Sequence, residues 1–350
     1  MPKVLFVSTV SVTSRFNIPF MKLLTEMGAE VHYAAAGEVI SGFRHHIIPF
    51  SRSPFSGDNI RAYKEMKKLL QLEKFDLIHC HTPVAAAITR LVARKFNVKV
   101  IYTAHGFHFY RGAPLINWLM YYPVEKILAK YTDCLITINQ EDYDLASKKF
   151  AKANIIKTHG VGINPIFTKE DTRSRFGIPE SSRVLLYIAE FNKGKNHAFL
   201  IEAMKKLPTH FILLLAGDGK LFEQTKTLAK DLPNIKFFGY RKDIPDVLNA
   251  ADIYVTPSLR EGLPVSVMEA MAAGLPVIAS KIRGHVDLIT NNKNGYLFDP
   301  KDINGFVNII KTLDLPNESV MDFNQKLLSK YSTESVNEQM ERIYKCYLML

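Results

Sequence analysis

The chain has 350 residues, of which 47% are apolar and 23% are charged, and its net charge is +11. This composition excludes a disordered chain, and the length is sufficient for two folded domains. Three scattered cysteines argue against a disulfide framework, and the sequence shows neither a signal peptide nor an apolar run of about eighteen residues, so a cytoplasmic location is predicted.

The first half of the chain alternates short apolar runs with longer runs of helical periodicity. Strands are predicted at 3–8, 30–36, 76–80, 99–104 and 133–138, and helices at 16–28, 83–96, 115–131 and 140–150. Continuous Val/Ile/Leu strands separated by helices are typical of a parallel sheet that is covered on both faces. We therefore predict a doubly wound, Rossmann-like α/β domain over residues 1–165. A linker is expected in the Gly-, Pro- and Ser-rich segment 158–182.

The second half repeats this alternation without repeating the sequence. Its apolar segments lie at 183–189, 197–207, 211–219, 234–240, 243–250, 252–258 and 275–280. They predict a second Rossmann-like domain over residues 166–331. Residues 332–350 are expected to form a closing helix that packs back on the first domain, with Val336, Met340, Ile343 and Leu348 at helical spacing. Two such domains facing each other would form a cleft, with ligands at the carboxyl ends of the strands.

Residues 257–280, PSLREGLPVSVMEAMAAGLPVIAS, follow one of these strand ends. Pro264 suits the first turn of a helix, whose free N–H groups near Val265 and Ser266 would form an anion site suited to a phosphate. Glu261 precedes this helix start, and Glu269 lies one turn beyond Val265 on the same face. One carboxylate could hold hydroxyls near the reacting end of a ligand and the other hydroxyls beyond the phosphate, which suits a sugar nucleotide.

Either glutamate alone could be a solvated turn or helix residue, but the surrounding pattern is specific. The segment resembles the retaining glycosyltransferases of the GT-B fold, glycosyltransferase family 4. The matching residues are Pro257, Ser258, Glu261, Gly262, Pro264, Glu269, Ala270, Gly274 and Pro276. The resemblance implies that the second domain binds a UDP-sugar, that Glu261 is catalytic at the transferred sugar, and that Glu269 contacts the ribose.

The resemblance extends to other segments of the second domain. It places Lys195 beside the diphosphate, and the segments with Gly217 and Arg241 around the nucleobase. The complete donor-binding set is Lys195, Gly217, Arg241, Gly262, Leu263, Pro264, Val265, Ser266 and Glu269. The chain departs from the family where Glu190 replaces a common arginine, and either a binding role or a solvated position is open for Lys193.

In the first domain, the resemblance implies a catalytic role for His105, which follows a predicted strand. Acceptor-side candidates are Ser11, Ser14, His81 and His108. The loop after the first strand lacks the family's paired glycines; its hydroxyls, Thr13 among them, are possible substitutes. His79, Cys80 and His81 lack zinc-ligand spacing, and the acids of residues 142–144 suit a helix start, so no catalytic metal and no cofactor are predicted.

Residues 1–165 hold 21 Lys+Arg and 12 Asp+Glu, a net charge of +9, which favours an anionic partner. Trp118, Tyr121 and Tyr122 could lie at a membrane interface or belong to the core, and both alternatives remain open. Residues 105–133 also resemble the family branch that builds bacterial capsular and extracellular polysaccharides on lipid-linked acceptors. A peripheral position on the inner face of the plasma membrane is therefore expected. Nucleic-acid binding is disfavoured because no binding motif accompanies the basic residues.

The sequence thus predicts a retaining, metal-independent glycosyltransferase that moves a sugar from a UDP-sugar to a glycan or lipid-linked acceptor. Two alternatives remain at this point. One is a sugar-nucleotide epimerase of the same architecture, and the other is a non-catalytic sugar-nucleotide-binding partner, which the absent arginine and glycines would suit. The donor sugar, the acceptor, the linkage and the oligomeric state do not follow from the sequence.

Overall fold

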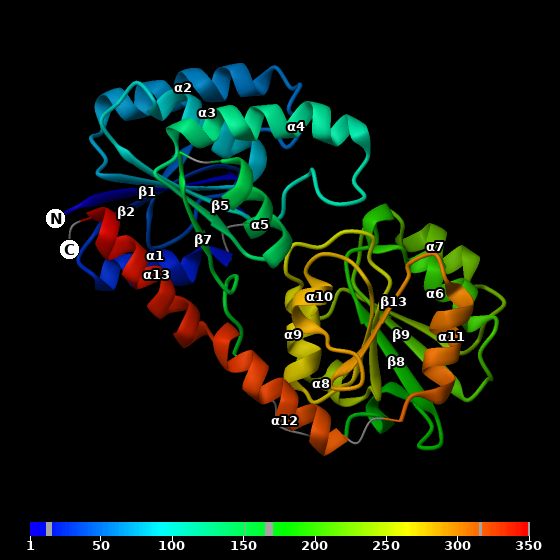
Figure 1. Cartoon of the computed structure of the whole chain (residues 1–350). Coiled ribbons are helices and arrows are strands. Elements are labelled where there is room, and N and C mark those ends of the chain that lie inside the picture. The colour runs from blue at the N-terminus through cyan, green and yellow to red at the C-terminus, as the bar shows by residue number, and fades with distance from the viewer. Residues whose placement is uncertain (12–15, 151, 165–170, 315–316, 349–350) are drawn as a thin grey trace. The chain divides into compact units, whose positions relative to one another are not determined.

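The computed structural model describes residues 1–11, 16–150, 152–164, 171–314 and 317–348 (Figure 1). The chain divides into two compact units: unit 1 comprises residues 1–162 and 333–350, and unit 2 comprises residues 163–332. Each unit is a parallel sheet with helices on both faces. The α/β class and the pair of Rossmann-like domains predicted from the sequence are confirmed.

Unit 1 contains a sheet of seven parallel strands in the order β3-β2-β1-β4-β5-β6-β7. The strands are β1 (Lys3–Val10), β2 (Glu30–Ala36), β3 (Arg44–Ile47), β4 (Leu77–His81), β5 (Lys99–Ala104), β6 (Cys134–Thr137) and β7 (Asn154–Lys157). The helices are α1 (Ile18–Glu26), α2 (Asp58–Leu72), α3 (Pro83–Ala93), α4 (Leu115–Leu128), α5 (Gln140–Lys149) and α13 (Thr333–Leu348).

The two faces of this sheet have separate hydrophobic cores. Helices α2, α3, α4 and α5 pack on one face, whereas α1 and α13 pack on the other. Helix α13 buries Val336, Met340, Ile343 and Tyr344 in the core on this second face, where the Tyr344 hydroxyl lies 2.9 Å from Nδ1 of His79 on β4. The C-terminal helix is therefore part of unit 1, although about 170 residues of unit 2 separate it from β7 in the sequence.

Unit 2 contains a sheet of six parallel strands in the order β10-β9-β8-β11-β12-β13. The strands are β8 (Arg183–Ile188), β9 (Phe211–Ala216), β10 (Ile235–Gly239), β11 (Ile253–Thr256), β12 (Val277–Ser280) and β13 (Gly295–Phe298). The helices are α6 (His197–Met204), α7 (Phe222–Leu228), α8 (Ile244–Asn249), α9 (Val265–Ala272), α10 (His285–Leu288), α11 (Ile303–Thr312) and α12 (Asn317–Leu328).

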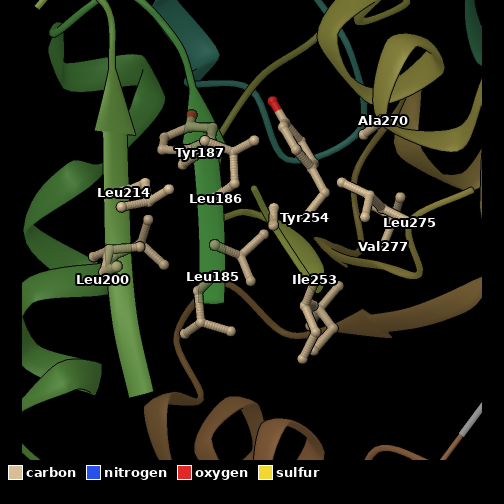
Figure 2. Close-up of a cluster of buried hydrophobic side chains, with 14 of the residues drawn as sticks. Leu185, Leu186, Tyr187, Leu200, Leu214, Ile253, Tyr254, Ala270, Leu275 and Val277 are labelled. Atoms are coloured by element: carbon tan, nitrogen blue, oxygen red, sulfur yellow. The ribbon is translucent and has the colours of Figure 1, made fainter. Parts of the chain in front are cut away.

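The core of unit 2 is built from the apolar strands that the sequence predicts. Figure 2 shows Leu185, Leu214, Ile253 and Val277 side by side from neighbouring strands, with Leu200 and Ala270 contributed by the covering helices. The hydroxyl of Tyr254 points toward the end of the sheet at which the strands terminate.

The prediction of a linker at 158–182 is wrong for residues 171–182, the C-terminal part of this segment that the structure describes. Thr172 donates a hydrogen bond to the carbonyl of Asp246 (2.7 Å), and Arg173 forms an ion pair with Asp252 (2.6 Å). Ile178 is buried in the core of unit 2. The segment packs on unit 2 through one apolar side chain and through contacts to residues more than seventy positions away. The sequence pattern could not predict this packing, because a Gly- and Pro-rich segment shows no helix or strand periodicity.

Strands β3 and β7 are edge strands that the sequence did not predict. Strand β3 has the sequence RHHI, and neither strand contains a fully buried residue. Edge strands have one unpaired side and need no continuous apolar run, so the pattern that marks central strands is absent from them. Within the described residues, no helix is both long enough and apolar enough to cross a bilayer.

Candidate functional site

The loop before α9 is held by residues from three strand ends of unit 2. The ammonium of Lys195 forms an ion pair with Oε1 of Glu261 at 2.5 Å, and only 12% of the glutamate side chain is exposed. Arg283 Nε donates to the carbonyl of Glu261 at 3.0 Å. A carboxylate and an ammonium are thereby fixed next to each other at the carboxyl end of the sheet, where ligands of this fold class bind.

A second set of hydrogen bonds fixes the backbone on both sides of this ion pair. The Tyr187 hydroxyl lies 2.9 Å from the carbonyl of Lys195 and 2.9 Å from the Ser258 hydroxyl. Ser280 Oγ donates to the carbonyl of Ser258, and Leu259 N–H donates to the carbonyl of Gly194. The segments that carry Lys195 and Glu261 are therefore tied together independently of their side-chain contact.

Helix α9 begins at Val265, with Pro264 at its N-cap position. Among the described residues, no side chain caps the first turn of this helix. The first hydrogen bond within the helix runs from Met268 N–H to the carbonyl of Pro264. The preceding N–H groups, including those of Val265 and Ser266, have no acceptor within the helix. Together with the macrodipole they favour an anion, as the sequence predicts.

Glu269 lies on α9, one turn after its start, and is half-buried. Burial raises the pKa of this carboxyl above its ordinary value. The Tyr254 hydroxyl, from strand β11, donates to the carbonyl of Ile188 at 3.2 Å and also lies within hydrogen-bonding reach of Ser266. A hydroxyl, a carboxyl and the free end of a helix are therefore gathered in one small region of unit 2.

Gly217 and Arg241 occupy the loops after β9 and β10. A Cβ atom on Gly217, whose φ is +136°, would lie 2.0 Å from the carbonyl oxygen of Ala189, so only glycine allows this close approach. Arg241 is paired with Asp243 and lies over the rings of Phe176 and Phe238, at 5.5 and 5.8 Å. Its guanidinium is thereby oriented by Phe176, Phe238 and Asp243 of unit 2. Lys193 and Glu190, left open by the sequence, are both exposed.

In unit 1 the structure brings His81 and His105 together. Their imidazoles, at the ends of neighbouring strands β4 and β5, lie 3.1 Å apart between Nδ1 of His81 and Nε2 of His105. His81 is buried, and burial lowers its pKa well below the ordinary value. His105 is exposed. An exposed imidazole is thus supported by a buried neutral one.

The other acceptor-side candidates are not all part of this pair. His108 stacks on Tyr121, with ring centroids 4.5 Å apart. Ser11 is buried after β1, where a Cβ on Gly37 would approach its hydroxyl to 2.8 Å. Ser14 and Thr13 lie outside the described residues.

Neither of the metal motifs considered in the sequence forms a metal centre among the described residues. His79 bonds Tyr344 and Thr103 through its two ring nitrogens, at 2.9 and 2.8 Å. Asp142, in the segment 142–144, accepts hydrogen bonds from Phe107 N–H and from Asn139 at the start of α5. Both groups therefore have structural partners.

His79 makes the stability of unit 1 depend on pH. Burial lowers its pKa to about 3, whereas a histidine in the unfolded chain titrates near about 6.5. Below that pH the unfolded state binds a proton that the folded state does not, so stability decreases as the pH falls. Between pH 7 and pH 5 we expect the wild type to lose about 2 kcal/mol more than His79→Gln, measured by urea unfolding at both pH values. An equal loss in both proteins would contradict this assignment.

Sequence reasoning missed Arg283, Gly284 and His285, which follow strand β12. His285 is buried, and its Nδ1 lies 2.8 Å from the carbonyl of Ser280. Burial lowers the pKa of His285, although the Glu261 carboxylate acts to raise it. A Cβ on Gly284 would lie 2.5 Å from the carbonyl oxygen of Gly262. The same strand-end rule that selected Glu261 would have found these residues if applied to β12.

We expect Gly284→Ala to displace the loop that carries Glu261. The residue has a φ of +81°, so alanine adds backbone strain of about 1–3 kcal/mol to the clash with Gly262. Any reaction at this site should slow about tenfold because the side chain of Glu261 is misplaced by a fraction of an ångström. Gly57→Ala is the control, since that glycine has a φ of −60° and open space at Cβ. Equal turnover in the two variants would contradict the close packing.

Comparisons with known proteins agree with this arrangement. A family model described as glycosyl transferases group 1 matches residues 168–327, and one described as glycosyl transferase 4-like matches residues 3–139. EpsD of Bacillus subtilis (strain 168), assigned provisionally as a glycosyltransferase, is 39% identical over 99% of this chain and 97% of its own length. The UDP-Gal:alpha-D-GlcNAc-diphosphoundecaprenol alpha-1,3-galactosyltransferase of Escherichia coli is 32% identical over 72% of this chain and 71% of its own.

Solved structures match the fold over the full length. Sucrose-phosphate synthase from Thermosynechococcus elongatus superimposes with a TM-score of 0.81 at 18% identity, covering 100% of both chains. HepE of Anabaena, crystallised with UDP and glucose, gives a TM-score of 0.80 at 18% identity, covering 99% of this chain and 100% of its own.

Proposed function

Since this chain belongs to the glycosyltransferases of family 4, with the GT-B fold, we propose that it is a retaining enzyme that transfers a sugar from a UDP-sugar to a lipid-linked or oligosaccharide acceptor in bacterial surface polysaccharide synthesis. The observation that carries the proposal is the Lys195–Glu261 ion pair beside the uncapped start of α9. It combines a carboxylate for sugar hydroxyls with two positive groups for a diphosphate.

The relatives support this choice of donor and acceptor. The Escherichia coli relative uses UDP-Gal and an acceptor linked to diphosphoundecaprenol, and HepE was crystallised with UDP and glucose. A lipid-linked diphosphate acceptor is also consistent with the basic first half of the chain. We place the enzyme on the cytoplasmic face of the membrane.

In the proposed reaction, a hydroxyl oxygen of the acceptor forms a bond to C1 of the donor sugar while the bond from C1 to the diphosphate breaks. The hydroxyl proton passes to the departing phosphate oxygen, on the same side of the sugar. The N–H groups before Met268 and the ammonium of Lys195 stabilise the charge that develops on the phosphate. No metal ion is assigned a role in this reaction.

The remaining residues are assigned by unit. Glu261 contacts the transferred sugar and Glu269 the ribose, and the rest of the donor set comprises Gly217, Arg241, Gly262, Leu263, Pro264, Val265 and Ser266. In unit 1 we propose that His105, supported by His81, acts near the donor sugar and acceptor, and that Ser11, Ser14 and His108 belong to the acceptor side.

The test is release of free UDP from UDP-glucose, UDP-galactose and UDP-N-acetylglucosamine by the purified protein, with and without a bacterial membrane lipid extract. We expect one donor to be consumed, with stimulation by the extract, and NMR of the product to show the α-anomer that retention requires. Turnover without any acceptor that yields an isomeric UDP-sugar would instead indicate an epimerase. UDP binding without turnover of any donor would indicate a non-catalytic partner.

A further inference from the structure

Helix α4 exposes an aliphatic face on the surface of unit 1. The exposed fractions are 81% for Leu115, 57% for Ile116, 73% for Leu119, 45% for Val124 and 54% for Ile127. The four- and eight-residue spacings place Leu115, Leu119 and Ile127 on one stripe. Exposed single apolar residues are ordinary, but a contiguous stripe on one helix marks an interaction surface. We call these five residues the α4 stripe.

The opposite face of α4 anchors the helix to the core. Trp118, Tyr121 and Tyr122 pack against the buried cluster beneath α4, and the ring of Trp118 lies 5.6 Å from that of Phe109. Of the two alternatives that the sequence left open for these aromatic residues, the structure therefore favours the core. The α4 stripe is the face that remains after this packing is complete.

Within segment 111–131 the exposed charges are of one sign, and the nearest printed carboxylate beside the segment is that of Glu141 on α5, which accepts a hydrogen bond from Arg111 N–H at 2.6 Å. Arg111, Lys126 and Lys130 are exposed, and Glu125 is the only acidic residue in segment 111–131. Glu125 is buried and paired with Arg90 at 2.8 Å, so its charge does not reach the surface. The exposed face of this segment is consequently apolar and cationic, with no exposed carboxylate.

The neighbouring helices extend the cationic surface. Helices α2, α3 and α4 cover the same face of the sheet, with α3 between α2 and α4 (Figure 1). On α2, Lys64, Lys67 and Lys68 are exposed, together with Ile60, which is 65% exposed. The layer formed by α2, α4 and the turn η2 (Ala129–Tyr131) after α4 therefore combines aliphatic side chains with five exposed lysines, against one exposed acid on α2, Glu65.

We propose that the α4 stripe, with the lysines of α2, α4 and η2, docks on the surface of an anionic phospholipid membrane, with α4 parallel to the bilayer plane. The aliphatic side chains would enter the boundary between headgroups and acyl chains, and each lysine near the surface would strengthen binding about fivefold. A second copy of the chain is a poorer occupant, because it would bring two lysine-rich faces together. The inference deepens the membrane part of the proposed function.

The experiment is cosedimentation of the full chain with lipid vesicles, without donor or acceptor. We expect binding to vesicles of phosphatidylglycerol and phosphatidylethanolamine, weaker binding at high salt, and at least about tenfold weaker binding to phosphatidylcholine alone. Equal binding to both kinds of vesicle, or no binding to either, would overturn the proposal.

Two variants locate the surface. Leu115→Glu combined with Leu119→Glu, and Lys126→Glu combined with Lys130→Glu, should each reduce binding at least about tenfold. The matched control is Leu228→Glu on α7 of unit 2, where the leucine is 50% exposed; it should bind like the wild type. Circular dichroism melts establish that each variant is folded. Folded variants that bind vesicles like the wild type would overturn the proposal. The proposal would also be overturned if the wild type formed a dimer that does not bind vesicles, and if Leu119→Glu dissociated that dimer.

The outcome is separable from that of the sugar-transfer test. Vesicle binding requires no turnover, so it can succeed even if no UDP is released from any donor. Conversely, UDP release from the donor without vesicles should be unchanged in these variants, because all four altered side chains, on α4 and on the turn η2 after it, are exposed. If a folded α4 variant lost both vesicle binding and UDP release, the assignment of this face to membrane binding only would be overturned.

Discussion

Glu261→Gln is expected to lower UDP release from the preferred donor by about 10²–10³-fold while UDP still binds within a few-fold of the wild type. The substitution preserves the shape of the side chain but removes the charge that faces Lys195 at 2.5 Å. Since the N–H groups at the start of α9, the proposed partners of the diphosphate, are unchanged, UDP should still bind. The measurements are initial rates of UDP release and isothermal titration with UDP.

The control for this variant is a second Lys–Glu pair in the same unit. Glu202 pairs with Lys205 on the surface of α6, where both side chains are about half exposed. Glu202→Gln should leave both turnover and UDP binding unchanged, because exposed pairs of this kind contribute little. Unchanged turnover in Glu261→Gln would remove Glu261 from the reaction, and loss of UDP binding would assign it to the donor's diphosphate instead.

Arg90→Met is expected to destabilise unit 1 by about 3–5 kcal/mol, because it leaves the Glu125 carboxylate buried without its cation. The guanidinium lies 4.1 Å from the centre of the Tyr102 ring and donates to Glu125 and to the carbonyl of Ala86. Urea unfolding followed by tryptophan fluorescence measures this effect in unit 1 specifically, since Trp118, the only tryptophan of the chain, lies on α4.

An exposed ion pair of the same unit provides the comparison. Lys99 and Asp133 lie 3.1 Å apart with 56% and 31% of their side chains exposed, so Lys99→Met should change stability by less than about 1 kcal/mol. Adding Glu125→Gln to Arg90→Met should recover part of the loss, because the unpaired charge is removed. If Arg90→Met and Lys99→Met were equally stable, burial of the Arg90–Glu125 ion pair would have no energetic consequence.

Several parts of the fold could be predicted because they depend on local pattern. The central strands β8 and β9, and the first part of β1, are continuous apolar runs, and burial on both faces of a parallel sheet requires such runs. The segment from Pro257 to Ser280 could be interpreted because its turn, helix start and acids are contiguous in the sequence. Nothing comparable marks β3 or the packed segment after residue 170.

The residues of the candidate site could be predicted only in part from the sequence. Strand-end position selected Glu261 and His105, and the family resemblance selected Lys195, but the contact between Lys195 and Glu261 joins residues 66 positions apart. Spacing along the chain cannot show such a contact. Arg283 and His285 were missed because a single arginine and a single histidine carry no pattern of their own.

The sequence by itself determined the two-domain α/β alternation, the donor-loop motif and the excess of positive charge in the first half, because each depends on residue type and local order. The tertiary structure decided which side chains meet: Lys195 with Glu261, Arg90 with Glu125, and His81 with His105. It also decided which face of α4 is buried. That helix is apolar nearly all the way round, so its periodicity cannot choose a face, and the choice follows from packing against the sheet.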